Sequence, residues 1–161
     1  MKRIGVISDT HIPKAAGDLP ERVYREFERV DLILHAGDLV ELSVLEKLRK
    51  VAPARAVYGN MDAAEVTGFL PRKDIIKVGG LRIGLIHGYG PPARIVEAVA
   101  KEFKKVDVIV FGHSHVALCE KIKNTLFFNP GSPTDRVFAP YTSFGILEVG
   151  KNGIAGMIMH L

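Results

Sequence analysis

The sequence predicts an α/β protein with a four-layer αββα sandwich, in which two mixed β-sheets pack face to face and helices lie outside. Two observations predict this class. Strand-like and helix-like segments alternate up to residue 106, whereas the helical pattern disappears from Ala117 onward and only strands remain. An alternating first part followed by a β-rich tail favours two packed sheets over a single doubly wound sheet.

Hydrophobic periodicity places the elements of the first half. Residues 2–8 (KRIGVIS) are mostly apolar and predict a strand. Residues 18–30 (DLPERVYREFERV) carry the amphipathic spacing of a helix, for which Asp18 is the expected N-cap. The same alternation continues, with strands expected at 31–37 and 54–60 and a helix at 43–50.

The second half begins with a predicted β-hairpin at 74–88, which turns at Gly79 and Gly80. Prolines open a predicted helix at 91–106, and the apolar run VDVIVF then predicts a strand that leads into GHSH at 112–115. The tail is expected to form two antiparallel hairpins, at 117–131 and at 142–161.

Composition limits the class of protein. At 161 residues the chain fits one domain, residues 1–161, and a hydrophobic fraction of 47% supplies a sizeable core. Its apolar runs fall far short of the roughly 20 residues that a membrane-spanning helix needs. The opening MKRIGVISD is too short and too soon acidic for a signal peptide, so we expect a cytoplasmic protein. The lone Cys119 has no disulfide partner and is expected to be buried.

The charge pattern argues against a nucleic-acid-binding protein, and the missing glycine motifs argue against a nucleotide-binding one. The net charge is +4, but Lys and Arg are interspersed with Glu and Asp, which is typical of solvated helix faces. A nucleic-acid surface would need clustered cations with interleaved aromatics, which the chain lacks. The first strand is followed by SDTH and not by GxGxxG or GxxxxGK[ST], which argues against a nucleotide-binding α/β protein.

Polar residues stand where the predicted strands end. Ligands of open α/β structures gather beyond the carboxyl ends of parallel strands, so these positions are candidates for a site. Each Asp or Asn alone would be read as an ordinary turn residue. However, four of the six histidines of the chain also occupy such positions. The candidate set is Asp9, His11, Asp38, Asn60, His87, His113 and His115.

Two pairs in this set have a spacing of two residues. His113 and His115 lie in GHSH, and Asp9 and His11 lie in SDTH. Side chains at i and i+2 project to the same side of an extended chain. We therefore expect each pair to converge on one point.

The chemistry of the set favours metal binding. Carboxylate, imidazole and amide ligands without a thiolate suit divalent ions such as Mn, Fe, Co, Ni or Zn, and fit a structural zinc site poorly. Seven ligands exceed the needs of one ion, but a bridging carboxylate would divide them into two sites. Two metals about 3.5–4 Å apart hold a hydroxide between them and neutralise both oxygens of an in-line phosphoryl displacement.

The blocks DxH, GD, GN, HG and GHSH, in this order, resemble the calcineurin-like metallophosphoesterases. The GNMD block and the NPGS at 129–132 resemble the small bacterial and archaeal phosphodiesterases of that superfamily, and also the small retromer subunit. The resemblance implies the two-sheet fold and a divalent-metal-dependent phosphodiesterase in which a metal-bridging hydroxide attacks in line. It implies two ions per chain, with manganese expected first and Ni, Fe, Co or Zn as alternatives.

The resemblance also implies roles for the seven residues, with Asp38, Asn60 and His87 expected to take part in catalysis. Asp38 would bridge the two ions. One ion would be held by Asp9, His11, Asp38 and His115, and the other by Asp38, Asn60, His87 and His113.

One position departs from the family pattern. Many relatives carry His directly after the Asn of the GN block, but here Met61 stands there. A thioether donates no proton, so general-acid help worth about 10²- to 10⁴-fold would be missing. We expect small phosphodiesters with aryl leaving groups to be hydrolysed readily, alkyl esters slowly, and monoesters less.

Several assignments stay open at this point. His35 would orient the Asp38 loop or be a satisfied core residue, Asp62 would relay a proton or form a turn, and Ser132 belongs to a tight turn or contacts substrate. The alternative function is a non-catalytic metal-binding scaffold for protein partners, as in the retromer subunit. The sequence leaves the substrate, the metal and a homo-oligomeric state undetermined.

Overall fold

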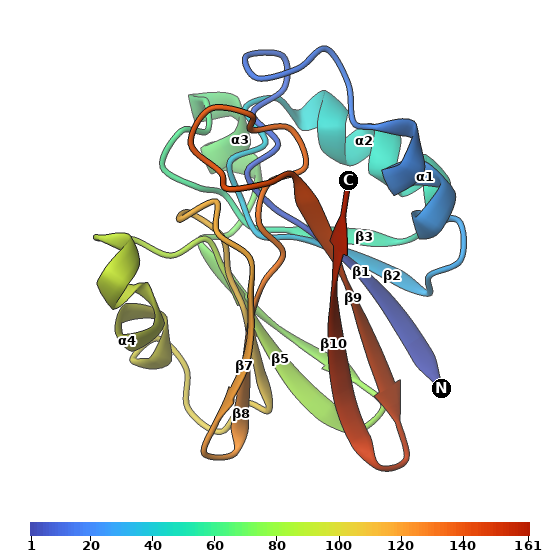
Figure 1. Ribbon diagram of the computed structural model, residues 1–161, viewed down its shortest axis with the longest axis vertical. Coiled ribbons are helices and arrows are strands. Elements are labelled where there is room, and N and C mark those ends of the chain that lie inside the picture. Colours follow the sequence, from blue (N-terminus) through green and yellow to red (C-terminus); the bar gives the residue numbers. More distant parts are fainter.

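The computed structural model describes residues 1–161 and consists of two five-stranded mixed sheets with helices outside them (Figure 1). The predicted fold class is therefore confirmed. The first sheet has the order β10-β9-β1-β2-β3, and the second has the order β4-β5-β6-β8-β7.

The first sheet combines parallel strands from the start of the chain with a hairpin from its end. β1 pairs in parallel with β2 and β2 with β3, while β9 runs antiparallel to both β1 and β10. The strands are β1 (Lys2–Ile7), β2 (Leu32–His35), β3 (Ala54–Ala56), β9 (Ser143–Gly150) and β10 (Gly153–His160).

The second sheet has a parallel centre between antiparallel edges. β5, β6 and β8 are parallel to one another, and β4 and β7 pair antiparallel with β5 and β8. The strands are β4 (Lys73–Val78), β5 (Leu81–Ile86), β6 (Val108–Val110), β7 (Leu118–Ile122) and β8 (Thr125–Asn129).

Three apolar clusters correspond to the three interfaces between four layers. Strand residues alternate between clusters because successive side chains point to opposite faces. Ile4 and Val6 of β1 pack between the sheets with Val108 and Val110 of β6. On the outer faces, Ile7 packs with residues of the first two helices, and Ile109 packs with residues of the helix that follows β5.

Two of the predicted helices are shorter than expected. α1 is Glu21–Phe27 and begins after Pro20, so the prediction of Asp18 as its N-cap is wrong. Asp18 instead accepts hydrogen bonds from the side chains of Tyr24 and Lys47. The long helix predicted at 91–106 is a 3₁₀ turn, η1 (Pro92–Arg94), followed by α4 (Ile95–Ala100). The remaining helices are α2 (Leu42–Val51) and α3 (Ala64–Phe69), of which α3 was not predicted.

The β-rich tail forms the two predicted hairpins, but each joins a different sheet. β7 and β8 extend the second sheet, whereas β9 and β10 complete the first. Cys119 lies exposed on edge strand β7, so the prediction that it is buried is wrong. Every helix is too short or too polar to cross a membrane.

Candidate metal centre

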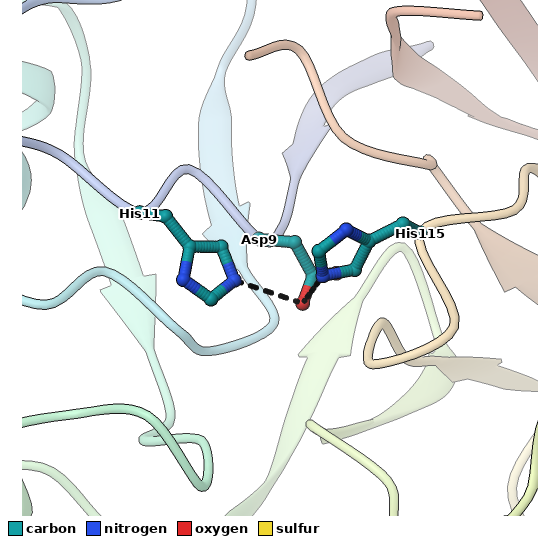
Figure 2. Close-up of side chains that lie close together, drawn as sticks. All are labelled: Asp9, His11 and His115. Carbon is teal, nitrogen blue, oxygen red and sulfur yellow. Dashed lines mark ion pairs between the residues drawn. The ribbon is translucent and has the colours of Figure 1, made fainter. Parts of the chain in front are cut away.

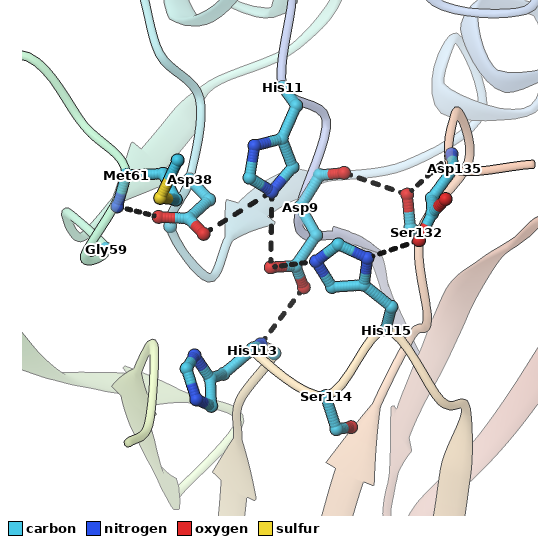
Figure 3. Close-up of polar contacts among 12 residues, drawn as sticks. Asp9, His11, Asp38, Gly59, Met61, His113, Ser114, His115, Ser132 and Asp135 are labelled. Carbon is cyan, nitrogen blue, oxygen red and sulfur yellow. Dashed lines mark hydrogen bonds and ion pairs between the residues drawn. The ribbon is translucent and has the colours of Figure 1, made fainter. Parts of the chain in front are cut away.

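The loops that follow β1, β2, β3, β5 and β6 meet at one edge of the two sheets (Figure 1). All seven residues predicted from the strand ends lie on these loops, and their side chains or backbones contact one another. Figure 3 shows Asp9, His11, Asp38, His113 and His115 in this cluster. The prediction that distant loop ends meet in space is therefore correct in its geometry.

The first group consists of Asp9, His11 and His115, which come from two sheets and point toward one another (Figure 2). The Oδ1 atom of Asp9 lies 3.4 Å from His115 Nε2 and 3.9 Å from His11 Nε2. Asp9 is fully buried, so its carboxylate depends on these neighbours for charge compensation.

The second group consists of Asp9, Asp38 and His87, all buried. His87 Nε2 lies 3.2 Å from Asp38 Oδ2 and 3.8 Å from Asp9 Oδ1. Asp38 Oδ2 also lies 3.4 Å from His11 Nε2. Both carboxylates therefore contact histidines of both groups.

Asn60 and His113 extend the second group. Asn60 Oδ1 lies 3.0 Å from His87 Nε2 and 3.1 Å from His113 Nδ1. The amide oxygen thus faces two ring nitrogens, as expected if all three share one cation. The backbone N–H of His113 donates to Asp9 Oδ2, which joins the GHSH loop to the end of β1.

Two buried atoms of the cluster have no hydrogen-bond partner. They are Asp9 Oδ1 and His11 Nε2, which face each other across the cluster. Unsatisfied buried polar atoms are rare and require an explanation. Two ligands of one ion, each about 2.0–2.2 Å from it, lie roughly 3–4 Å apart, which is the spacing seen here. The residues therefore fit a divalent metal ion.

Hydrogen bonds outside the cluster select which nitrogen of three histidines faces inward. His87 Nδ1 donates to the carbonyl of Ala36, and His113 Nε2 donates to the carbonyl of Gly90. A carbonyl only accepts, so the other nitrogen of each ring is free to bind a cation. His115 is oriented in the same way by a carboxylate.

That carboxylate belongs to Asp135, which the sequence analysis missed. His115 Nδ1 lies 2.5 Å from Asp135 Oδ2 (Figure 3). Asp135 is also buried and accepts hydrogen bonds from the backbone N–H groups of Val137, Phe138 and Ala139. In the sequence it is one polar residue of a turn after NPGS, with no pattern that marks it.

Ser132 and Asn129 hold the backbone of the centre. The buried hydroxyl of Ser132 donates to the carbonyl of Asp9 and accepts from the N–H of Asp135. Asn129 donates to the carbonyl of Gly112 and to Ser114 Oγ. Ser132 therefore has a supporting role rather than the substrate contact left open from the sequence.

Five of the seven candidate residues have positive φ angles, a conformation that is uncommon outside glycine. They are Asp9 (54°), His11 (44°), Asp38 (58°), His113 (69°) and His115 (58°). The backbone at these positions is therefore not extended, and the prediction that an extended chain aligns the i and i+2 side chains is wrong. The side chains converge because tight left-handed loops turn them inward, and such strain concentrates at functional sites.

Asp62 and His35 fix the loop that carries Asp38. The Asp62 carboxylate accepts hydrogen bonds from the N–H groups of Asp38, Val40 and Gly59. His35 Nδ1 accepts from the N–H of Gly37, so Nε2 donates to Thr10 Oγ1. Complete burial lowers the pKa of His35 to about 3, which keeps it neutral. His35 therefore orients the Asp38 loop, and Asp62 binds backbone rather than relaying a proton.

The carboxylates raise the pKa of two histidines in the metal-free protein. Burial lowers the pKa of His87, but the hydrogen bond to Asp38 and the charges of Asp9 and Asp38 outweigh burial and raise it to about 9. The nearby Asp9 carboxylate, 3.4 Å from Nε2, with help from Asp135, raises the pKa of His115 to about 9. Without a metal ion, protons on His87 and His115 thus compensate the negative charges of Asp9 and Asp38.

Comparison with known proteins shows the family of this chain. A family model described as the calcineurin-like phosphoesterase superfamily domain matches residues 1–152. A probable metallophosphoesterase of Methanocaldococcus jannaschii is 41% identical over 134 residues, which are 81% of this chain and 68% of the relative. A phosphodiesterase of the same organism is 27% identical over 143 residues, which are 80% of this chain and 82% of that protein.

The fold is also similar to a solved structure. Vps29 of Entamoeba histolytica, crystallised with zinc, has a TM-score of 0.75 and 24% identity, and the match covers 98% of each chain. At this identity the similarity concerns the fold alone. Because the family model spans nearly the whole chain, the protein belongs to the calcineurin-like phosphoesterase superfamily.

Proposed function

We propose that the protein is a divalent-metal-dependent phosphodiesterase with a binuclear centre, with manganese as the expected metal. The observation that carries this proposal is the converging set of seven ligands, in which Asp9 Oδ1 and His11 Nε2 lack any other partner. Two bound ions would supply a water-derived nucleophile and neutralise the phosphoryl oxygens during in-line displacement.

The contacts support a division of the ligands between two ions. His11 and His115 lie beside Asp9, whereas His87 and Asn60 lie beside His113 on the other side. Asp38 Oδ2 lies within 3.4 Å of both His11 and His87, which supports its role as the bridging carboxylate. The backbone N–H of Met61 donates to Asp38 Oδ1 and leaves Oδ2 directed at the centre.

The substrate class follows from the position of Met61. Its half-exposed thioether stands next to Asn60 and donates no proton to a leaving group. Esters that leave as stable phenolates need little proton transfer, so aryl phosphodiesters should react fastest and alkyl esters slowly. The phosphodiesterase among the relatives supports diesters over monoesters.

Hydrolysis of bis(p-nitrophenyl) phosphate with added Mn²⁺ or Ni²⁺ tests the proposal directly. We expect turnover that a chelator removes and that added metal restores, with p-nitrophenyl phosphate hydrolysed more slowly. Elemental analysis of the purified protein should find two equivalents of metal per chain. Turnover that persists after metal removal contradicts the proposal.

A non-catalytic scaffold is the second candidate function. The similarity to Vps29 and the absence of a proton donor at Met61 favour it. The same assay separates the two candidates, because a metal-loaded scaffold binds two ions without hydrolysing diesters.

Met61→His is expected to restore part of the missing general-acid help. For diesters with poor leaving groups we expect kcat to rise by about 10-fold or more, a modest share of the 10²- to 10⁴-fold that such groups supply. Rates for a series of leaving groups of increasing pKa measure this effect. Met61→Leu is the matched control, and equal rates for the two variants contradict the interpretation of this position.

Asp135→Asn is expected to weaken metal binding by about 10- to 100-fold, because carboxylates that orient a ligating histidine have effects of this size. Asparagine retains the shape of Asp135 but loses the charge paired with His115. Calorimetric titration with Mn²⁺ measures the change. Asp31→Asn, at an exposed site that contacts Lys2 and Arg3, is the control and should leave the affinity unchanged.

Metal binding near neutral pH is expected to release protons. His87 and His115 both have a pKa near 9 in the metal-free protein, so both are protonated at pH 7 and must lose a proton to bind an ion. The affinity should therefore rise with pH up to about 9 and level off above it. Calorimetry at pH 7 in buffers of different ionisation enthalpy counts the protons, and release near zero contradicts these pKa values.

A further inference from the structure

A second feature lies directly beside the proposed metal centre. A pocket of about 220 Å³ is lined by Asn60 and His87, two of the seven candidate ligands. Its remaining walls include Tyr58, Arg72 and Tyr89. A group attached to a phosphate at the centre would therefore lie near this pocket.

The walls of the pocket are held in place by Glu102. Arg72 donates two parallel hydrogen bonds to the Glu102 carboxylate, at 3.0 and 2.9 Å. The Tyr89 hydroxyl donates to Glu102 Oε1 at 3.0 Å, and Lys73 Nζ donates to Glu102 Oε2. The Arg72 guanidinium lies 5.7 Å from the centre of the Tyr89 ring. One carboxylate thus holds two residues of the pocket lining, Arg72 and Tyr89.

Arg72 is held in an ion pair. Hydrogen bonds from Arg72 and Lys73 lower the pKa of Glu102 to about 2, so Glu102 stays ionised and pairs with both cations. The Arg72 guanidinium is therefore fixed in orientation. Aromatic and guanidinium faces stack on planar rings.

The volume limits the size of the occupant. Pockets that enclose whole drug-sized ligands measure about 300–1,000 Å³. A pocket of about 220 Å³ fits one substituent of a diester rather than the whole molecule. In an in-line displacement the nucleophile and the leaving group lie on opposite sides of phosphorus. The substituent that is retained projects sideways, toward the walls of the site.

We propose that the Tyr58–Arg72–Tyr89 pocket binds the retained substituent of the diester and selects a planar aromatic group, such as a nucleobase or an aryl ring. This inference rests on the proposed phosphodiesterase function and names the substrate class of the same site.

Three esters with one leaving group test the inference. They are the p-nitrophenyl phosphodiesters of benzyl alcohol, cyclohexylmethanol and the 5′-hydroxyl of thymidine, which all join phosphorus through a CH₂–O link. We expect kcat/KM to be about 5-fold higher for the benzyl ester than for the cyclohexylmethyl ester, the effect of one aromatic contact beyond its buried area. A higher value for the thymidine ester than for the benzyl ester identifies a nucleobase as the preferred ring.

Variants of Tyr89 connect the preference to the pocket. Tyr89→Ala should reduce the benzyl to cyclohexylmethyl ratio to near one, whereas Tyr89→Phe retains the ring and should retain most of the ratio. Tyr141→Ala is the matched control, since Tyr141 stacks on His160 and does not line the pocket. Thermal unfolding of each variant checks that the fold is intact.

Binding without turnover separates this inference from the proposed function. Calorimetric titration of the manganese-loaded protein with benzyl phosphate and with cyclohexylmethyl phosphate should show the same preference, and Tyr89→Ala should remove it. Equal Kd values and an equal kcat/KM for the two esters overturn the pocket inference. Failure to hydrolyse any of the three esters contradicts the proposed function, and the two Kd values then decide the inference alone.

Discussion

Asp38→Asn is expected to lower kcat/KM for bis(p-nitrophenyl) phosphate by about 10³-fold. Bound metals contribute several kcal/mol of transition-state stabilisation, and about 4 kcal/mol corresponds to 10³-fold. Asp38 is 2% exposed and places one oxygen within 3.4 Å of His11 and His87. Its replacement removes the charge that both proposed ions share. The rate is measured by steady-state kinetics with saturating Mn²⁺.

Asparagine at position 38 preserves the local structure better than alanine would. Its side-chain oxygen still accepts the hydrogen bond from the N–H of Met61, so the loop should hold. We expect the Tm of the metal-free variant to stay close to that of the metal-free wild type, although the rate falls strongly. Asp31→Asn is again the control for a lost surface carboxylate. A variant at position 38 that keeps a tenth or more of the wild-type rate disproves the bridging role.

Gly112→Ala should have the second large effect, on stability and metal binding together. A Cβ atom at this position would overlap Ser8 Oγ and lie 2.6 Å from Asp9 Oδ2. Overpacking of this kind typically costs about 1–3 kcal/mol. Because the clash pushes directly on Asp9, the metal-induced increase in the free energy of unfolding should also shrink.

Urea unfolding with and without Mn²⁺ measures both parts of this prediction. Gly68→Ala is the matched control, because Gly68 lies in α3 with no neighbouring atom within 4 Å of an added Cβ. That variant should gain about 0.5–1 kcal/mol, since alanine is the better helix former. If Mn²⁺ raises the free energy of unfolding of Gly112→Ala as much as that of the wild type, the prediction is wrong. The close contact between Gly112 and Asp9 is then not required for metal binding.

The layered fold was predictable because burial imposes simple periods on the sequence. Near-continuous apolar runs, such as Ile4–Ile7 and Val108–Phe111, mark strands covered on both faces. Helix ends were harder to predict. Asp18 has the residue type of an N-cap but binds Tyr24 and Lys47 instead, contacts that depend on how α1 and α2 pack.

The candidate ligands were predictable from the sequence because the carboxyl ends of parallel strands lie at the same end of a sheet. The residues that follow each strand therefore meet there. Composition and periodicity thus determined the layers and the seven residues. Tertiary structure alone decided the left-handed loops that turn these side chains inward, the pairing of Asp135 with His115, and the contacts of Glu102 with Arg72 and Tyr89. These features join residues 13 to 30 positions apart or depend on local strain, and no sequence period records such contacts.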